Sequence, residues 1–442
     1  MSLSSDKKLG LWSLTSLVAG NMIGSGAYLI PASLAIYGSI GIFAWILTAI
    51  GVLFLAQVYA RLSKMIPKSG GPYAYCRAAY GDYTGFQIAY NYWLYTWIGN
   101  AAISVGFVSY LSIFFPSLEH NIFHALLSSL SVLWFLTFIN MANIRWAGNL
   151  QLVTTILKLI PLFLMAFVGI FFIHPDNLTT HFNVSNQSNL LALMGAGSIT
   201  LWAFTGFESA TIPAGRVEDP VKNIPRATLL GTLIVIVVYI LSTISVMGLI
   251  PMDHLAHSTA PYAEAAESIF GSGMGKVVAL CAVIAVFGEL NGWVLLQGEM
   301  PQAAAADHLF PQVFAKRFKS GAPVWGLLIS SCLITLLLLL RYGVSLIEEF
   351  TFIILLATFA ALIPYIHTAL AEVILLARDK SQYSKPHLIK AGIIAFFAFL
   401  YAFWAIIGAG KEIVFYGFLL YVSGIPVFYW VKRTEGKGNL IS

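Results

Sequence analysis

Residues 20–26 of the chain read GNMIGSG, and residues 30–32, in the same uncharged run, read IPA. A second stretch has the same form: residues 202–209 read WAFTGFES, and residues 212–214 read IPA. Glycine destabilises a helix by roughly 1 kcal/mol relative to alanine, and proline removes a backbone donor. Two long apolar segments are therefore predicted to be helices with an interruption near the middle.

The two stretches correspond to each other at a fixed offset. Moving the first by 182 positions places Gly24 on Gly206 and Pro31 on Pro213. Five predicted spans separate equivalent positions, and an odd number of spans inserts the second copy upside down relative to the first. This is the layout of an inverted repeat of five plus five helices.

The composition around these stretches indicates a lipid environment. Of 442 residues, 59% are apolar and only 10% are charged, whereas a globular domain carries about a quarter charged residues. A membrane span needs about 20 apolar residues. The uncharged runs predict an all-α integral membrane protein with twelve transmembrane helices, of which the first and sixth are broken. Their ranges are 11–33, 38–60, 84–114, 123–142, 148–173, 192–214, 227–250, 276–304, 323–341, 350–377, 389–409 and 412–431.

Lysine and arginine are distributed unequally between the loops on the two sides of this arrangement. One set of alternate segments holds twenty of them and the opposite set holds three, while Lys158 falls inside the fifth span. Because cytoplasmic loops retain positive residues during insertion, both termini are predicted to lie in the cytoplasm. The chain is expected to be one transporter domain, with a first repeat over about 10–175, a second over about 190–378 and two extra helices over about 387–432.

Several other classes of protein are disfavoured. The three cysteines are scattered and form neither a disulfide framework nor a metal-ligand motif. The histidines lack ligand spacing, so no metal, cofactor or membrane enzyme is expected. A channel would need a continuous pore lined by repeated polar residues, and the paired interruptions argue against one. Nothing in the charge distribution suggests nucleic acid.

The interruptions themselves have two readings. Unwound backbone in hydrocarbon is tolerated around a protein-lined cavity, where its free N–H and C=O groups can bind a polar ligand. Alternatively, the glycines allow close helix packing, as small residues often do in membranes. The matched pair of interruptions favours a binding site.

The quoted stretches, together with residues 292–293 (GW) and 68–75 (KSGGPYAY), resemble the basic amino acid/polyamine antiporters of the amino acid, polyamine and organocation superfamily. The combination of Trp202, Glu208 and Trp293 most resembles the arginine/agmatine exchangers, with putrescine/ornithine and lysine/cadaverine exchangers near them. The resemblance implies alternating-access exchange of a cationic amino acid, arginine first, for its amine decarboxylation product. It also implies a bacterial inner (plasma) membrane, a role in acid resistance and a homodimer formed through the last helices.

The resemblance also implies residue roles. The segment containing Ile23, Ser25 and Gly26 would hold the substrate carboxylate, which agrees with the positive end of a helix N-terminus. Trp202 would lie against the cationic side chain, because a desolvated cation over tryptophan gains about 1 to 2 kcal/mol. Trp293 would form a second aromatic wall or gate. The remaining substrate-binding positions of this pattern are Thr96, Asn100, Thr205 and Ala357.

Two charged residues within spans are candidates for coupling. Intramembrane acids are costly and are functional candidates by default. Glu208 is expected to pair with the substrate cation, to take up a proton that gates transport, or to form a static hydrogen bond. Lys158 is expected to be a fixed counter-charge or to extend toward an interface.

Other residues depart from the arginine/agmatine pattern or extend it. Glu289, four residues before Trp293, stands where that pattern has a small polar residue; it would bind a dication or a proton, or face water. Tyr92, Thr96 and Asn100 recur four apart and are expected to face a hydrated cavity. Tyr95 replaces a small residue and Ala357 replaces a hydroxyl. These changes narrow the pocket and remove a hydrogen bond to the substrate, and a compact diamine or a shorter basic amino acid remains compatible with the pattern. The acids Glu299 and Glu372 are expected to be structural.

One rival function remains within transport. A proton-coupled amino acid importer would use Glu208, Glu289 and Lys158 as its relay. Obligatory exchange and import differ in whether uptake requires substrate on the inside.

Overall fold

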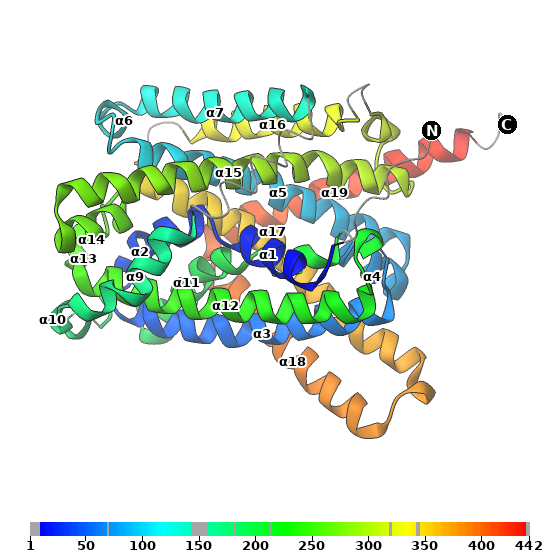
Figure 1. Ribbon diagram of the computed structural model, residues 1–442. Helices are drawn as coiled ribbons and strands as arrows, with labels where there is room; N and C mark the ends of the chain where they lie inside the picture. Colours follow the sequence, from blue (N-terminus) through cyan, green and yellow to red (C-terminus); the bar gives the residue numbers. More distant parts are fainter. Residues whose placement is uncertain are drawn as a thin grey trace.

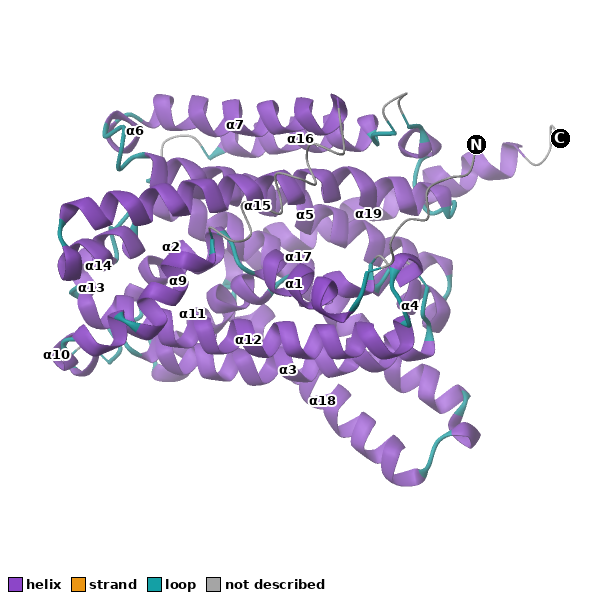
Figure 2. Cartoon of the chain, viewed as in Figure 1, coloured by secondary structure: helices purple, strands orange, loops and turns teal. Residues whose placement is uncertain are grey.

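The computed structural model describes residues 9–68, 70–142, 158–180, 182–212, 214–317, 321–341 and 345–438. Long helices form most of this part of the chain and lie side by side in a bundle (Figure 1), and no strand is assigned within it (Figure 2). The elements are α1 (Leu11–Met22), α2 (Ser25–Ala35), α3 (Ile40–Met65), α4 (Pro72–Tyr80), α5 (Asp82–Leu111), α6 (Ser117–His120), α7 (Ile122–Ala142), α9 (Leu159–Phe167), η1 (Gly169–Phe172), α10 (Pro175–Thr179), α11 (Asn189–Phe204), η2 (Phe207–Thr211), η3 (Ala214–Arg216), α12 (Pro220–Leu249), α13 (Met252–Leu255), α14 (Pro261–Phe270), α15 (Ser272–Ala306), η4 (Gln312–Ala315), α16 (Val324–Leu340), α17 (Leu346–Arg378), η5 (Lys380–Gln382), α18 (Lys385–Gly408) and α19 (Lys411–Gly438).

Nine segments within the described ranges are long and apolar enough to cross a membrane. Each coincides with one of the twelve predicted spans, and the two segments with predicted interruptions are among them. The expectation of an all-helical, multi-pass membrane protein is therefore confirmed. The nine are Leu11–Ala35, Ile40–Met65, Ile122–Ala142, Asn189–Thr211, Pro220–Leu249, Ser272–Ala306, Leu346–Arg378, Lys385–Gly408 and Lys411–Thr434.

The other three predicted spans differ from these nine. α16 is apolar but has only 17 residues. α5 has 30 residues and carries polar side chains such as Gln87, Asn91 and Asn100, all of them buried against other helices. The first part of the predicted fifth span, residues 148–157, lies outside the described residues, and α9 follows it.

The interrupted segments lie at the centre of the bundle. In the most apolar window of Leu11–Ala35 and of Asn189–Thr211, 83% of the residues are buried, compared with 17% for Lys411–Thr434. α5 packs against α15 and α17, and α12 packs against α1 and α3. In Figure 1, α7 and α16 lie along one edge of the bundle and α18 projects from the opposite edge. The predicted binding segments are thus enclosed by protein on most sides.

Candidate functional site

The first interruption lies between α1 and α2. α1 ends at Met22, Ile23 and Gly24 leave the helical conformation, and α2 begins at Ser25. A helix end leaves carbonyl groups at its C-terminus and N–H groups at its N-terminus without partners in the helix. Two residues of non-helical backbone therefore create free acceptors and free donors within a buried segment.

Two side chains from outside the segment bind the carbonyl groups at the end of α1. Nζ of Lys158 donates a hydrogen bond to the carbonyl oxygen of Gly20. Oη of Tyr239, in α12, donates to the carbonyl oxygen of Met22 at 2.6 Å. A cation at a helix C-terminus opposes the negative end of the helix dipole. Lys158 is fully buried, and its ammonium group lies at the C-terminal end of α1.

A carboxylate binds the opposite end of the interruption. Oε2 of Glu289, in α15, accepts a hydrogen bond from the backbone N–H of Ser25 at 2.6 Å. The space for this carboxylate exists because residue 24 is glycine: a Cβ atom on Gly24 would lie 1.9 Å from the Glu289 carboxyl carbon. Glu289 is only 6% exposed, so the reading in which it faces water is wrong.

The second interruption follows α11, which ends at Phe204. Thr205 is extended, Gly206 has a φ of 102°, and the 3-10 turn η2 begins at Phe207. A positive φ of this size favours glycine. A Cβ atom on Gly206 would lie 3.1 Å from the carbonyl oxygen of Asn21, near the end of α1. The two interruptions are therefore in contact with each other, although Pro213 lies outside the described residues.

Glu208 is fully buried just beyond the second interruption. Its Oε1 accepts a hydrogen bond from Oη of Tyr92 at 3.3 Å, and its Oε2 accepts one from Oη of Tyr365 at 3.1 Å. Oε2 also accepts from the backbone N–H of Gly206 at 3.2 Å. The carboxyl group thus connects α5, α17 and the second interruption.

A small closed cavity lies between the two interruptions. Its volume of about 10 Å³ is room for about one water molecule. Three aromatic side chains and one carboxylate form its most distinctive walls. The lining residues are Asn21, Met22, Gly26, Tyr95, Trp202, Ala203, Thr205, Glu289 and Trp293.

Glycines on two helices fix the position of the Trp202 indole. A Cβ atom on Gly26 would lie 2.8 Å from its Cδ1, and a Cβ atom on Gly99 would lie 2.7 Å from its Cη2. Tyr95 meets Trp202 and Trp293 edge-on, with ring centroids 6.1 Å and 5.3 Å apart. The three rings together form an aromatic wall beside the Glu289 carboxylate.

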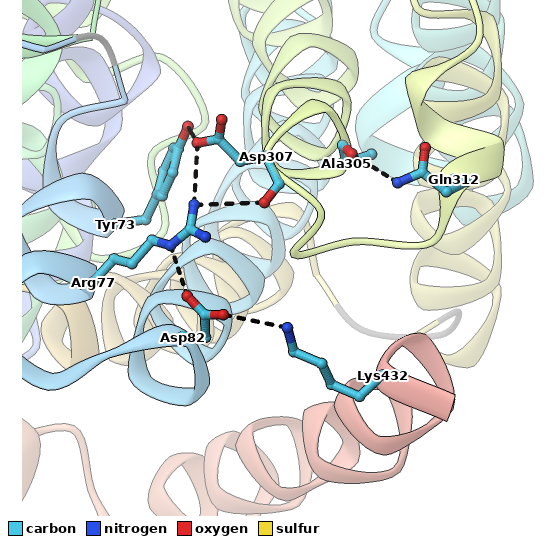
Figure 3. A network of polar contacts seen from close by, with 7 residues as sticks. All are labelled: Tyr73, Arg77, Asp82, Ala305, Asp307, Gln312 and Lys432. Carbon is cyan, nitrogen blue, oxygen red and sulfur yellow. Dashed lines mark hydrogen bonds and ion pairs between the residues drawn. The ribbon is translucent and has the colours of Figure 1, made fainter. Parts of the chain in front are cut away.

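Ionic contacts tie α4, α5, α15 and α19 together at one end of the bundle (Figure 3). Asp82 contacts Arg77 at 2.8 Å and Lys432 at 3.2 Å. Asp307 accepts a hydrogen bond from Tyr73 at 3.0 Å and lies 3.8 Å from Arg77. Asp82 precedes the apolar part of α5, and the hydrogen bond from Arg77 lowers its pKa below the usual value. The four charged side chains of this network are 37–48% exposed, so it lies at the surface of the bundle.

A larger cavity of about 740 Å³ lies at the other end, where α6 is found; α4 and α6 mark the two ends in Figure 1. It lies among α6 and the first turns of α7, α17 and α19. Glu119, Glu348, Glu349 and Glu412 line it together with Lys411. The structure therefore has a cavity lined by acidic residues at one end and a network of ionic contacts at the other.

Comparison with known families agrees with this architecture. Residues 9–431 match the sequence profile of the family described as amino acid permease. The chain belongs to the amino acid permease family. This permease is thus a member of the superfamily that its sequence resembles, and a transporter role is supported over an enzymatic one.

Several proteins of similar sequence are named as transporters or antiporters. The permease is 38% identical to the cadaverine/lysine antiporter of Escherichia coli over 76% of each chain. It is 33% identical to the putrescine transporter PotE of Haemophilus influenzae over 96% of this chain and 97% of that one. It is 32% identical to a putative arginine/ornithine antiporter of Bacillus subtilis over 98% of each.

The cavity brings together five of the residues predicted from the permease's sequence. These are Gly26, Trp202, Thr205, Glu289 and Trp293. Tyr95, expected to narrow the pocket, also lines it. The cavity walls that sequence reasoning did not assign are Asn21, Met22 and Ala203. Asn21 and Met22 belong to the glycine-rich stretch at residues 20–26, and their position beside the interruption could have indicated that they line the cavity.

The other predicted residues surround the cavity without lining it. Thr96 donates to the carbonyl oxygen of Trp93 in its own helix, and Asn100 donates to Gln297 at 2.7 Å. With Tyr92 bound to Glu208, the expected polar stripe of α5 is thus engaged within packed protein. The residues outside the lining are Ile23, Ser25, Tyr92, Thr96, Asn100, Lys158, Glu208 and Ala357.

The two acids expected to be structural form ion pairs. Glu299 contacts Arg317 at 3.1 Å. Glu372 pairs with Arg61 of α3, whereas Arg378, its neighbour in sequence, donates to backbone carbonyls of α4. Both acids therefore lie outside the candidate site.

Proposed function

We propose that this permease is a secondary exchanger that trades a cationic amino acid for the amine left by its decarboxylation. The observation that carries the proposal is the closed cavity between two interrupted helices, walled by Trp202, Trp293 and the Glu289 carboxylate. Aromatic faces and a carboxylate together suit an organic cation. The backbone N–H of Ser25, which the Glu289 carboxylate occupies in this structure, suits the carboxylate of an amino acid. The cadaverine/lysine, putrescine and arginine/ornithine transporters to which the permease is similar support the same class of substrate.

The proposed architecture is one domain of twelve spans, built as an inverted five-plus-five repeat with two added helices. Contact between the two interruptions at Gly206 and Asn21 supports this arrangement. With both termini in the cytoplasm, as the charge count predicts, the end that holds the Arg77–Asp307 contact faces inward and the acidic cavity faces outward. The bacterial inner membrane is the proposed location, and a homodimer through α18 and α19 is the proposed assembly.

The residues around this cavity favour a compact substrate pair over a long one. Tyr95 projects between Trp202 and Trp293, and Ala357 offers no hydroxyl group. We therefore rank lysine with cadaverine, or ornithine with putrescine, ahead of arginine with agmatine. Decarboxylation of the amino acid inside the cell consumes a proton, and the amine product carries one more positive charge than the amino acid. Exchange of the two would therefore export positive charge and support acid resistance.

The proposed roles divide between binding and gating. Trp202 is the platform for the substrate cation, and Trp293 is the gate on the opposite side of Tyr95. Glu208 links α5 and α17 to the second interruption, so its hydrogen bonds with tyrosines are placed to change when the bundle opens. Lys158 stabilises the end of α1. Ile23, Ser25 and Gly26 are proposed to receive the carboxylate of an amino acid.

Transport in proteoliposomes tests the proposal. Vesicles loaded with cadaverine, putrescine, agmatine or no amine receive labelled lysine, ornithine or arginine outside. Obligatory exchange predicts uptake only when a matching amine is inside. Uptake that is independent of internal substrate and driven by a proton gradient would reject exchange in favour of the importer, for which the buried Glu208, Glu289 and Lys158 are the candidate relay.

A further inference from the structure

We propose that Glu289 occupies the position where the α-carboxylate of an amino acid substrate would bind, so that, once the pocket opens, a diamine can bind with Glu289 in place whereas a basic amino acid must displace it. This inference rests on the proposed function and assigns a specificity-determining role to a residue for which the sequence left several roles open.

The carboxylate-binding position is formed by the backbone at the start of α2. The first N–H of α2, on Ser25, donates to the Glu289 carboxylate at 2.6 Å. An N-terminal N–H group at the positive end of a helix is a ready site for a carboxylate. The same backbone is where an amino acid would place its own carboxylate. Glu289 is therefore an internal occupant of an anion site.

This position is also shaped for a carboxylate. Gly24 leaves the space that the Glu289 carboxyl group fills, because a Cβ atom there would approach it to 1.9 Å. Glu289 lines the same small cavity as Trp202 and Trp293 and is 6% exposed. The carboxylate thus lies simultaneously on the helix end and on the wall of the substrate pocket.

The charges of the two substrates have opposite consequences at this position. A diamine has two ammonium groups; one can lie against the Trp202 indole while the other meets Glu289 as a counter-ion. An amino acid brings a carboxylate to a position that already holds one, and like charges in one site repel. Only the amino acid requires Glu289 to move.

The nearest other acid does not fill this role. Glu208 lies outside the cavity lining and its carboxyl group is engaged by Tyr92, Tyr365 and the backbone N–H of Gly206. The cation Lys158, at the far side of the interruption, attracts Glu289 electrostatically. A purely structural partnership with Lys158 would affect all substrates alike, and this distinguishes it from the proposed role.

Calorimetric titration of the full-length protein in nanodiscs tests the inference. Cadaverine, lysine and lysinamide, which lacks the carboxylate, are titrated into the wild type, Glu289→Ala and Glu289→Gln. In Glu289→Ala, the ratio of the lysine Kd to the cadaverine Kd is expected to fall by about tenfold or more. The Kd of lysinamide is expected to change in the same direction as the Kd of cadaverine, because lysinamide lacks the carboxylate. Glu289→Gln keeps the carboxylate-binding position filled but removes the charge, so cadaverine binding weakens while lysine binding changes by less than about threefold.

Each outcome has a defined meaning. An unchanged lysine-to-cadaverine ratio in Glu289→Ala, or equal weakening of both ligands in Glu289→Gln, overturns the inference; the glutamine variant also decides the question if the alanine variant does not fold. Glu299→Gln, ten residues along α15 and paired with Arg317, is the matched control and is expected to retain the wild-type ratio. Failure of the wild type to bind any of the three ligands would instead reject the proposed function.

Discussion

The hydroxyl group of Tyr365 donates a hydrogen bond to Oε2 of the fully buried Glu208 at 3.1 Å. This contact joins the middle of α17 to the 3-10 turn that follows the second interruption. Because Glu208 does not line the small cavity, this hydrogen bond joins α17 to the second interruption without forming part of the proposed substrate site. Its loss is expected to affect the movement between states more than binding.

Tyr365→Phe tests this separation. A hydrogen bond to a charged group contributes about 1.5–3 kcal/mol, so the maximal exchange rate is expected to fall by about tenfold while the substrate Kd stays within about threefold. Tyr80→Phe is the control, since the Tyr80 hydroxyl bonds only a backbone carbonyl of α17 at 3.2 Å. A large loss of affinity with an unchanged rate would show that Glu208 belongs to the binding surface.

The two tryptophans of the cavity are expected to have different roles. Trp202→Ala removes the platform for the cation and is expected to weaken binding by about ten- to thirtyfold, the equivalent of about 1 to 2 kcal/mol. Trp293→Ala is expected to slow exchange with a smaller change in Kd. Binding and initial rates are measured on the same preparations. Equal losses of affinity in the two variants would contradict the assignment of platform and gate.

Gly99 is expected to control the position of the Trp202 indole. A methyl group at this position would lie 2.7 Å from Cη2 of Trp202, a separation at which the ring must shift. Gly99→Ala is therefore expected to weaken substrate binding by about tenfold. Gly392→Ala adds the same methyl group where no atom lies within 4 Å and is expected to bind normally. If both variants bind like the wild type, the indole does not need this position.

The buried ion pair between Arg61 and Glu372 is expected to stabilise the bundle without affecting specificity. Glu372 is fully buried and Arg61 has a side-chain exposure of 19%. Arg61→Ala leaves a buried carboxylate unpaired and is expected to cost about 3–5 kcal/mol. The double variant Arg61→Ala/Glu372→Ala is expected to be more stable than Arg61→Ala alone. Thermal melting in detergent measures this difference, and a double variant that melts lower than both single variants would contradict the pairing.

Asp82 is expected to give a small acid-sensitive contribution to stability. Its hydrogen bond with Arg77 lowers its folded-state pKa, so the contribution is present above the ordinary aspartate pKa of about 3.9 and is lost as the pH falls through the lower folded-state pKa. The Asp82 side chain is 45% exposed, and solvent screening keeps the effect small. The difference in melting temperature between the wild type and Asp82→Asn is expected to shrink toward zero on acidification. A difference that grows below about pH 4 would contradict this sign.

The positions of the long apolar helices and of their interruptions could be predicted from the sequence, because these features depend on residues that are close together in the chain. Runs of apolar residues predict the nine segments that the structure shows to be long and apolar enough to cross a membrane. The glycine-rich stretches coincide with the end of α1 at Met22 and the end of α11 at Phe204. Helix propensity and hydrophobicity act over one or two turns, so a single sequence contains this information.

Contacts between residues far apart in the sequence could not be predicted in this way. Arg61 and Glu372 are 311 positions apart, so spacing along the sequence gives no sign of this pair. Glu289 was placed on the face of Trp293 by its four-residue spacing, but its contact with Ser25 spans 264 positions. Tyr92, Thr96 and Asn100 of α5 were expected to face a hydrated cavity, whereas their hydrogen-bond partners are Glu208, a carbonyl group of α5 itself and Gln297 of α15.

The central claim is that the interrupted helices form the substrate site. A structure determined by electron cryo-microscopy with saturating cadaverine tests this claim most directly. We expect density for the diamine between the Trp202 indole and the Glu289 carboxylate, with Trp293 on the opposite wall. Density confined to the acidic cavity near Glu348 and Glu349, in a preparation that exchanges cadaverine, would contradict the account.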